Sequence, residues 1–214
     1  ISGRNSNGLG VGFFNAVSSN AYAEIIDSEN QIREELNSPI TNYNVFVLDQ
    51  NLKNNSSISI VNTNVLRVGS DYDANVTAGL FNLFTENSTY NFGGFYKLSQ
   101  KYYADSTALG HSGQIRLEKP TGNFIYEFRY LVESDTYDPN DLGFLFNNNS
   151  RELSAMLMYR EFNPKNKHIN SWRLRSSATY SRVYNPNAFA EISHRTWGNI
   201  ETKNFNVFGW WVNG

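Results

Sequence analysis

Residues 123–133 read NFIYEFRYLVE, and this stretch decides the fold class. Large apolar side chains occupy every second position, and asparagine or charged side chains occupy most positions between them, with Ile125 and Leu131 as exceptions. Successive side chains of a β-strand point to opposite faces, so this alternation predicts a strand with one aromatic face and one charged face. The same alternation recurs in residues 89–98 and 171–181, which makes it a repeated property of the chain.

Two sets of side chains follow from such segments, one for each face of the strands. The apolar set is Tyr90, Phe92, Tyr126, Phe128, Trp172, Leu174 and Tyr180. The polar set is Lys97, Arg116, Glu118, Glu127, Arg129, Arg173 and Arg175. We expect the first set to face lipid and the second to face the interior of a barrel.

Runs of this kind cover most of the chain and are separated by Asn, Gly, Pro, Asp or Ser. Helices should be few, because no helical stripe of apolar residues is sustained. The predicted strands are residues 1–4, 8–17, 42–52, 56–68, 73–85, 89–100, 109–119, 123–134, 142–147, 151–162, 168–184, 188–198 and 203–213. This spacing predicts an all-β antiparallel sandwich or barrel and does not fit alternating strands and helices.

The connections between the predicted strands favour a barrel. Short turns such as 5–7, 53–55 and 120–122 alternate with longer segments such as 18–41 and 135–141. In an up-and-down sheet, alternate turns lie at opposite ends, so one end of the sheet would carry short turns and the other end would carry longer loops. Outer-membrane barrels have this asymmetry. The expected fold is therefore an antiparallel up-and-down transmembrane β-barrel, of which residues 1–214 supply about 12–14 strands as one domain.

Composition excludes several classes of protein. The 214 residues include no cysteine, so they hold no disulfide framework and no cysteine-ligated metal. The 18 basic and 20 acidic residues leave no basic excess for nucleic acid. Mean hydropathy is −0.50, which argues against a membrane-spanning helix, but it does not argue against barrel strands, because only alternate residues of such strands meet lipid.

Large aromatic residues on one face can pack in a sandwich core or meet a membrane. Trp172 and Tyr180 are eight positions apart, which corresponds to about 27 Å along a strand or about 20 Å in height once the strand is tilted. That height is close to the lipid-facing band of a barrel. Aromatic residues make up 15% of the chain and there are only two Met. This composition favours aromatic belts at the two membrane interfaces over aromatic side chains packed in a protein core.

No catalytic or cofactor site is visible in the sequence. His111, His168 and His194 are far apart and lack any metal-ligand spacing, so we expect them in loops or facing the interior. The acidic stretches 71–75 and 138–141 could offer oxygen ligands to Ca²⁺, but ordinary turns explain them better. We therefore expect no enzyme activity, no cofactor and no bound metal.

Two further features leave alternatives open. The polar set could form a charged lumen that guides a solute, or a network of paired Arg and Glu that fills the interior; its mixed signs favour the network. The connection 18–41 is acidic and carries Ile25, Ile26, Ile32 and Leu36, so it could form a lid or a hairpin, and its Glu-rich part could hold a helical turn.

Several stretches are similar to one uncharacterised Bacteroidota outer-membrane family. They are residues 2–4 with 8–17, TNYNVFVLDQNLKNNSSISIVNTNVLR at 41–67, DYDANVTAGLFNLF at 71–84, and YDPNDLGFLFNNN at 137–149. In that family a signal peptide and a carbohydrate-binding family 9-like domain precede a C-terminal β-barrel of unknown function. The resemblance implies an outer-membrane location and an absent N-terminal domain, and it supplies no catalytic residues.

These observations lead to three expectations about function. The first is an integral outer-membrane barrel of a Gram-negative bacterium with a transport, pore or envelope-assembly role. The second is a plugged barrel that anchors a glycan-binding or partner-binding domain. The third is a soluble β-sandwich or propeller lectin. Under the first two, the partners are outer-membrane lipid and lipopolysaccharide, other outer-membrane or periplasmic proteins, and a glycan held by the absent domain. We also expect further strands beyond this span, because the predicted strand count is odd.

Overall fold

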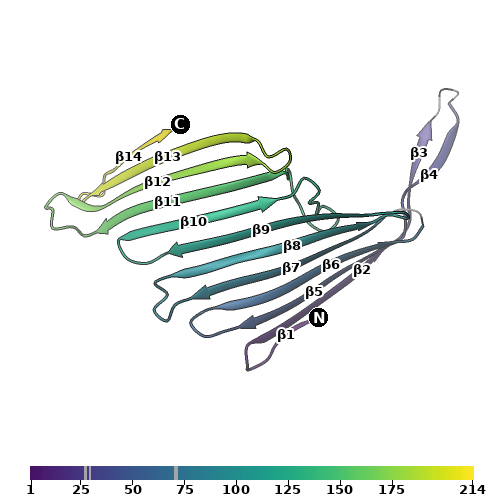
Figure 1. The fold of residues 1–214 in the computed structure, drawn as a ribbon, viewed down its shortest axis with the longest axis horizontal. Helices are drawn as coiled ribbons and strands as arrows, with labels where there is room; N and C mark the ends of the chain where they lie inside the picture. Colours follow the sequence, from purple (N-terminus) through teal and green to yellow (C-terminus); the bar gives the residue numbers. More distant parts are fainter. Residues whose placement is uncertain (27, 29, 70–71) are drawn as a thin grey trace.

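The computed structural model describes residues 1–26, 28, 30–69 and 72–214. It forms one antiparallel sheet of 12 strands and a separate two-stranded hairpin (Figure 1). The order of the large sheet is β1-β2-β5-β6-β7-β8-β9-β10-β11-β12-β13-β14, so each strand pairs with the next one along the chain except where the hairpin β3-β4 intervenes. The all-β antiparallel prediction is confirmed, and the described residues contain no helix that could cross a membrane.

The strands have the following bounds: β1 Ser2–Arg4, β2 Leu9–Ser18, β3 Ala21–Ile26, β4 Ile32–Ser38, β5 Thr41–Asn51, β6 Ser57–Arg67, β7 Asp73–Phe84, β8 Asn91–Tyr102, β9 Thr107–Lys119, β10 Phe124–Glu133, β11 Ser150–Phe162, β12 Ile169–Val183, β13 Phe189–Thr202 and β14 Val207–Asn213. Twelve of these correspond to ranges predicted from the alternation of polarity. The strands β3 and β4 form a hairpin within the connection 18–41, which was one of the alternatives for that segment, and they extend away from the large sheet (Figure 1).

The prediction of a strand at 142–147 is wrong. These residues belong to the long connection between β10 and β11, where Asn140 accepts a hydrogen bond from the Leu145 backbone N–H at 2.7 Å. The alternating Phe144 and Phe146 suggested a strand, but their rings pack edge to face against one another, with centroids 4.5 Å apart and an interplanar angle of 76°. Local turns satisfy the backbone here without a partner strand.

The sheet is open, since β1 and β14 each pair on one side only within the described residues. The structure therefore does not close a barrel, and the barrel remains a prediction. The turns at one end of the sheet are all short, namely 5–8, 52–56, 85–90, 120–123, 163–168 and 203–206. The other end carries the β3-β4 hairpin and the long connection 134–149, but also the short turns 103–106 and 184–188. The loops at this end are therefore less uniformly long than the sequence predicted.

Few apolar side chains are buried. The buried hydrophobic residues among those described are Val65, Ala74, Ala78, Ile125 and Tyr137, whereas large side chains such as Phe92, Phe128 and Leu157 are more than 40% exposed. A single sheet has no second layer to cover its apolar face, and this exposed face has to be explained by what lies against it.

Candidate functional site

The strand register assigns every side chain of the large sheet to one of two faces. Directly opposed residues on neighbouring strands share a face. In β10, Arg129 lies opposite Arg116 of β9, whereas the adjacent Phe128 lies opposite Leu117. Continuing these pairings from strand to strand defines a charged face, which includes Arg129, and an aromatic face, which includes Phe128.

Both predicted sets of residues fall cleanly on these faces. The polar set, all on the charged face, is Lys97, Arg116, Glu118, Glu127, Arg129, Arg173 and Arg175. Six members of the apolar set, namely Phe92, Tyr126, Phe128, Trp172, Leu174 and Tyr180, lie on the aromatic face, and Tyr90 directly precedes β8, two positions from Phe92. Of the apolar set, Tyr126 and Trp172 are partly covered by neighbouring rings, and the other five are exposed. The strand register thus separates the two sets onto opposite faces of the sheet.

The charged face is not a closed network of ion pairs. Within the polar set, the one ion pair among the described residues joins Arg116 Nε to Glu118 Oε2 at 3.8 Å. Arg116 also donates to Asn91 at 3.1 Å, and Arg129 donates to Ser154 at 3.5 Å. The Nε atoms of Arg116 and Arg129 are buried and have no hydrogen-bond partner. The face therefore keeps unused hydrogen-bond donors, contrary to the expected network.

The long connection between β10 and β11 lies against the charged face, and we call residues 134–149 the covering loop. Gly110 of β9 belongs to the charged face, and a Cβ at this position would lie 2.3 Å from the carbonyl oxygen of Thr136. Only glycine allows the loop backbone to approach this closely. Tyr137 is 2% exposed, and its burial raises the pKa of its hydroxyl to about 12.

Ion pairs hold the covering loop to strands that are distant in sequence. Asp141 pairs with Arg67 of β6 at 2.5 Å and lies 3.7 Å from Lys101 of β8, and Asp138 pairs with the same lysine at 2.5 Å. Burial raises the pKa of Asp138, but hydrogen bonds from Lys101 and from the backbone of Asn140 outweigh it, so the pKa lies below its ordinary value. These ion pairs therefore fix the loop to β6 and β8 of the charged face.

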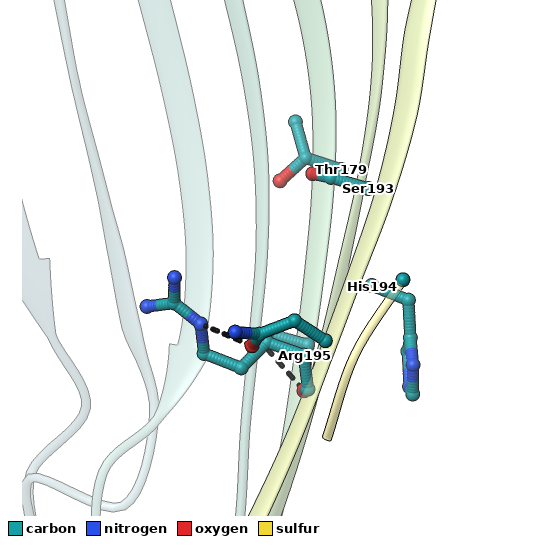
Figure 2. A pocket seen from close by; sticks show the side chains of 7 residues that line it. Thr179, Ser193, His194 and Arg195 are labelled. Carbon is teal, nitrogen blue, oxygen red and sulfur yellow. Dashed lines mark hydrogen bonds between the residues drawn. The ribbon is translucent and has the colours of Figure 1, made fainter. Parts of the chain in front are cut away.

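A polar hollow of about 360 Å³ lies near the C-terminal edge of the sheet (Figure 2). Thr179, Ser193 and Arg195 line it from the charged face, and Arg195 donates to the Asn213 side chain at 3.0 Å. Figure 2 shows the side chain of His194, the neighbour of Arg195, on the opposite side of the strand. The hollow thus offers hydroxyl and guanidinium donors.

The three histidines are not brought together. His194 lies on the aromatic face, where its Nε2 is 3.0 Å from the hydroxyls of both Ser176 and Thr196. His111 stacks on Tyr96 on the aromatic face, and His168 lies in the turn before β12. His168 therefore lies in a turn, as expected, whereas His111 and His194 lie on the aromatic face and not in loops or on the charged face.

Carboxylates and histidines of the described residues form no group of three or more that could hold a metal ion. The acidic stretch 138–141, a calcium candidate in the sequence, uses its carboxylates to bind Lys101 and Arg67. In the other calcium candidate, 71–75, Asp71 lies outside the described residues, while Asp73 accepts from the backbone N–H of Arg67 at 2.7 Å.

The aromatic face is interrupted by asparagine in its N-terminal strands. Asn15 donates to Asn42 and Asn44 at 2.8 and 2.7 Å, and Asn62 donates to Asn75 at 3.1 Å. These residues share a face with the exposed apolar side chains of the same strands. The apolar stripe is therefore complete in β10 but shorter in β5 and β6, which sequence reasoning based on three aromatic segments did not detect.

Sequence reasoning also missed most of the residues that position the covering loop. Arg67 and Asp141 are 74 positions apart, and no local spacing connects them. The available signal was the acidic DPND stretch at 138–141 in a long connection, combined with one basic residue near the C-terminal end of each of β6 and β8, namely Arg67 and Lys101.

No curated protein and no solved structure matches the chain. One family model does match, and it covers residues 1–214. The chain therefore belongs to the family described as Domain of unknown function (DUF5916).

Proposed function

We propose that this chain is part of an outer-membrane β-barrel of a Gram-negative bacterium and that the whole barrel carries solutes across that membrane. The observation that carries the proposal is the single 12-stranded meander with its two chemically distinct faces. The aromatic face would meet the hydrocarbon and the charged face would line the lumen. Lipid and lipopolysaccharide are then the first partners of the chain.

The lack of a second layer supports lipid over water as the neighbour of the aromatic face. Phe92, Phe128 and Leu157 would expose contiguous apolar surface to water in a soluble protein. Large contiguous apolar patches on a protein surface mark sites of contact with another protein or with a membrane. A soluble sandwich or propeller lectin, the alternative from another class, would instead divide the strands into two stacked sheets or into short blades.

The aromatic stripe runs obliquely across the sheet, as a level membrane band does on tilted strands. The stripe runs from Tyr90 to Leu98 along β8, from Phe124 to Val132 in β10 and from Trp172 to Tyr180 in β12. Its middle positions are therefore Gly94, Phe128 and Ser176. Phe128 aligns with Phe92, two positions from Gly94, and Ser176 aligns with Tyr126, two positions from Phe128. The stripe thus shifts by about one residue per strand.

That shift gives a strand tilt. One residue corresponds to about 3.4 Å along a strand and neighbouring strands are about 4.8 Å apart, so the tilt is about 35°. Closed barrels tilt their strands by about 35–45°. The register and the placement of the apolar side chains therefore support a closed barrel.

Closure of the barrel requires strands that pair with β1 and β14. Unpaired backbone groups at a sheet edge are costly in lipid, so a membrane-spanning sheet has no open edges. We propose that further strands of the same protein pair with both edges. Other outer-membrane or periplasmic proteins, and a glycan bound by an additional domain, remain proposed partners of the whole protein.

The covering loop favours a second candidate function, which is a plugged barrel that anchors a binding domain or serves envelope assembly. Its ion pairs to β6 and β8 place a folded segment over the face that would line the lumen. A loop folded into a lumen narrows a pore or blocks it, depending on how many strands complete the barrel.

Planar-bilayer recordings of the whole protein separate these functions. A transporting barrel gives steady conductance steps, and a plugged anchor gives none. Before that, the purified protein should require detergent and should migrate differently on gels with and without heating. A protein that stays monomeric in water without detergent contradicts the membrane proposal altogether.

A further inference from the structure

Four arginines gather on the charged face of β11, β12 and β13. Arg160 lies directly opposite Arg173, Arg175 is two positions further along β12, and Arg195 lies on β13 diagonally from Arg175. Directly opposed residues have Cβ atoms about 5 Å apart and diagonal ones about 7–8 Å apart. We call Arg160, Arg173, Arg175 and Arg195 the arginine patch.

Carboxylates do not neutralise the arginine patch. In the part of the chain that the structure describes, no ion pair includes any of its four members. Arg160 donates a hydrogen bond to the carbonyl oxygen of Gly122 at 3.3 Å, and Arg195 donates one to Asn213. The side chains of Arg173 and Arg175 make neither an ion pair nor a hydrogen bond with the described residues. The guanidinium groups of the latter two are thus available to a ligand.

The arrangement opposes the stability of the sheet. Like charges directly opposite one another on neighbouring strands are unfavourable, and Arg160 faces Arg173 in this way. Glu201 of β13 lies on the same face, diagonally from Arg173, but it accepts a hydrogen bond from Ser171 at 3.0 Å instead of pairing with an arginine. Packing of the fold does not account for four arginines in one place without a carboxylate partner among the described residues.

The surroundings of the patch are those of a binding surface. Trp197 lies opposite Arg175 on the charged face, and Trp211 of β14 lies opposite Trp197. The polar hollow with Thr179 and Ser193 adjoins Arg195 and adds hydroxyl donors (Figure 2). Guanidinium and hydroxyl donors together suit oxyanions, and indole rings suit a flat or ring-shaped group carried beside the charge.

We propose that the arginine patch binds an oxyanion, namely the phosphate, sulfate or carboxylate group of a solute whose ring lies over Trp197. The proposal deepens the proposed function by naming the substrate class of the lumen, and it rests on that function only for the location of the patch inside a barrel. Binding itself requires just the register and the free guanidinium groups.

Calorimetric titration of the whole protein in detergent tests the proposal, with inorganic phosphate and glucose 6-phosphate as probes and glucose as the uncharged comparison. We expect both phosphates to bind, the sugar phosphate more tightly, and glucose not to bind. The double variant Arg173→Gln/Arg175→Gln should weaken phosphate binding by at least about tenfold, since it removes two charged donors. The matched control is Arg33→Gln, which removes one charge from the exposed hairpin.

Heat-modifiable migration on gels confirms that each variant has folded. Unchanged phosphate affinity in the folded double variant, or no phosphate binding by the unmodified protein, overturns the proposal. Tighter binding of glucose than of phosphate overturns it as well. The outcome is separable from the proposed function: phosphate binding without conductance contradicts transport alone, and conductance without an effect of the double variant on binding contradicts the patch alone.

Discussion

Replacing Phe128 by arginine distinguishes a lipid-facing sheet from a water-facing one. Phe128 is the middle of the aromatic stripe in β10, and its side chain is 46% exposed. On a water-covered face, an exposed substitution of this kind changes the free energy of unfolding by about 0.5 kcal/mol or less. At the middle of a bilayer, arginine on the lipid face of a barrel costs about 2–4 kcal/mol.

The same strand supplies the depth control. Phe124 and Val132 lie four positions from Phe128 on the same face, which is about 14 Å along the strand and about 11 Å in height at a tilt of about 35°. Since the apolar band is about 25 Å tall, both lie at its margins, where the cost of arginine falls to about 0–1 kcal/mol.

Urea titration of folding into lipid vesicles measures these three costs, with Arg129→Ala on the charged face as the matched control. We expect a profile that peaks at Phe128→Arg and is low at Phe124→Arg and Val132→Arg. A flat profile below about 0.5 kcal/mol, or a peak at one end of the strand, would refute the assignment of faces and the tilt derived from the stripe.

Three further predictions concern the covering loop. Asp141→Asn should release the loop from Arg67. We expect faster proteolytic cleavage within 134–149, and larger conductance if the protein forms a pore. Unchanged cleavage would contradict a role of this ion pair in holding the loop. Because the pKa of Asp138 is lowered in the folded protein, its ion pair with Lys101 should be intact above the ordinary carboxyl value of 3.8 and should be lost as the pH falls further. Cleavage within 134–149 should therefore accelerate only in strong acid. Acceleration near neutral pH would speak against this ion pair. Gly110→Val should displace the loop, since its Cβ would meet Thr136, and a variant that is as protected as the unmodified protein would be incompatible with the contact.

The strands and their faces could be predicted from the sequence because a period of two is a local property. Phe124, Tyr126 and Phe128 already identify both the strand and the side that carries its rings, and the register then extends this assignment to the neighbouring strands. The same local reasoning failed at 142–147, where alternating Phe144 and Phe146 occur in a segment without a partner strand.

The position of the covering loop could not be predicted, because it depends on which strands become neighbours. Asp141 contacts Arg67 only after β6, β7 and β8 have paired and brought the ends of β6 and β8 beside the loop. The asparagine side chains on the aromatic face of β5 and β6 were visible in the sequence, but the stripe was inferred from segments richer in aromatic residues. The arginine patch likewise required the register, since Arg160 and Arg173 lie on different strands.

The central claim is that the aromatic face meets hydrocarbon while the charged face meets water. The 214 residues contain no cysteine, so single cysteines can be placed at Phe128 and at Arg129 and labelled with nitroxide. In lipid vesicles, we predict that relaxation by oxygen dominates for the label at Phe128 and relaxation by a water-soluble nickel complex dominates for the label at Arg129. Equal and strong relaxation of both labels by the nickel complex would contradict the account.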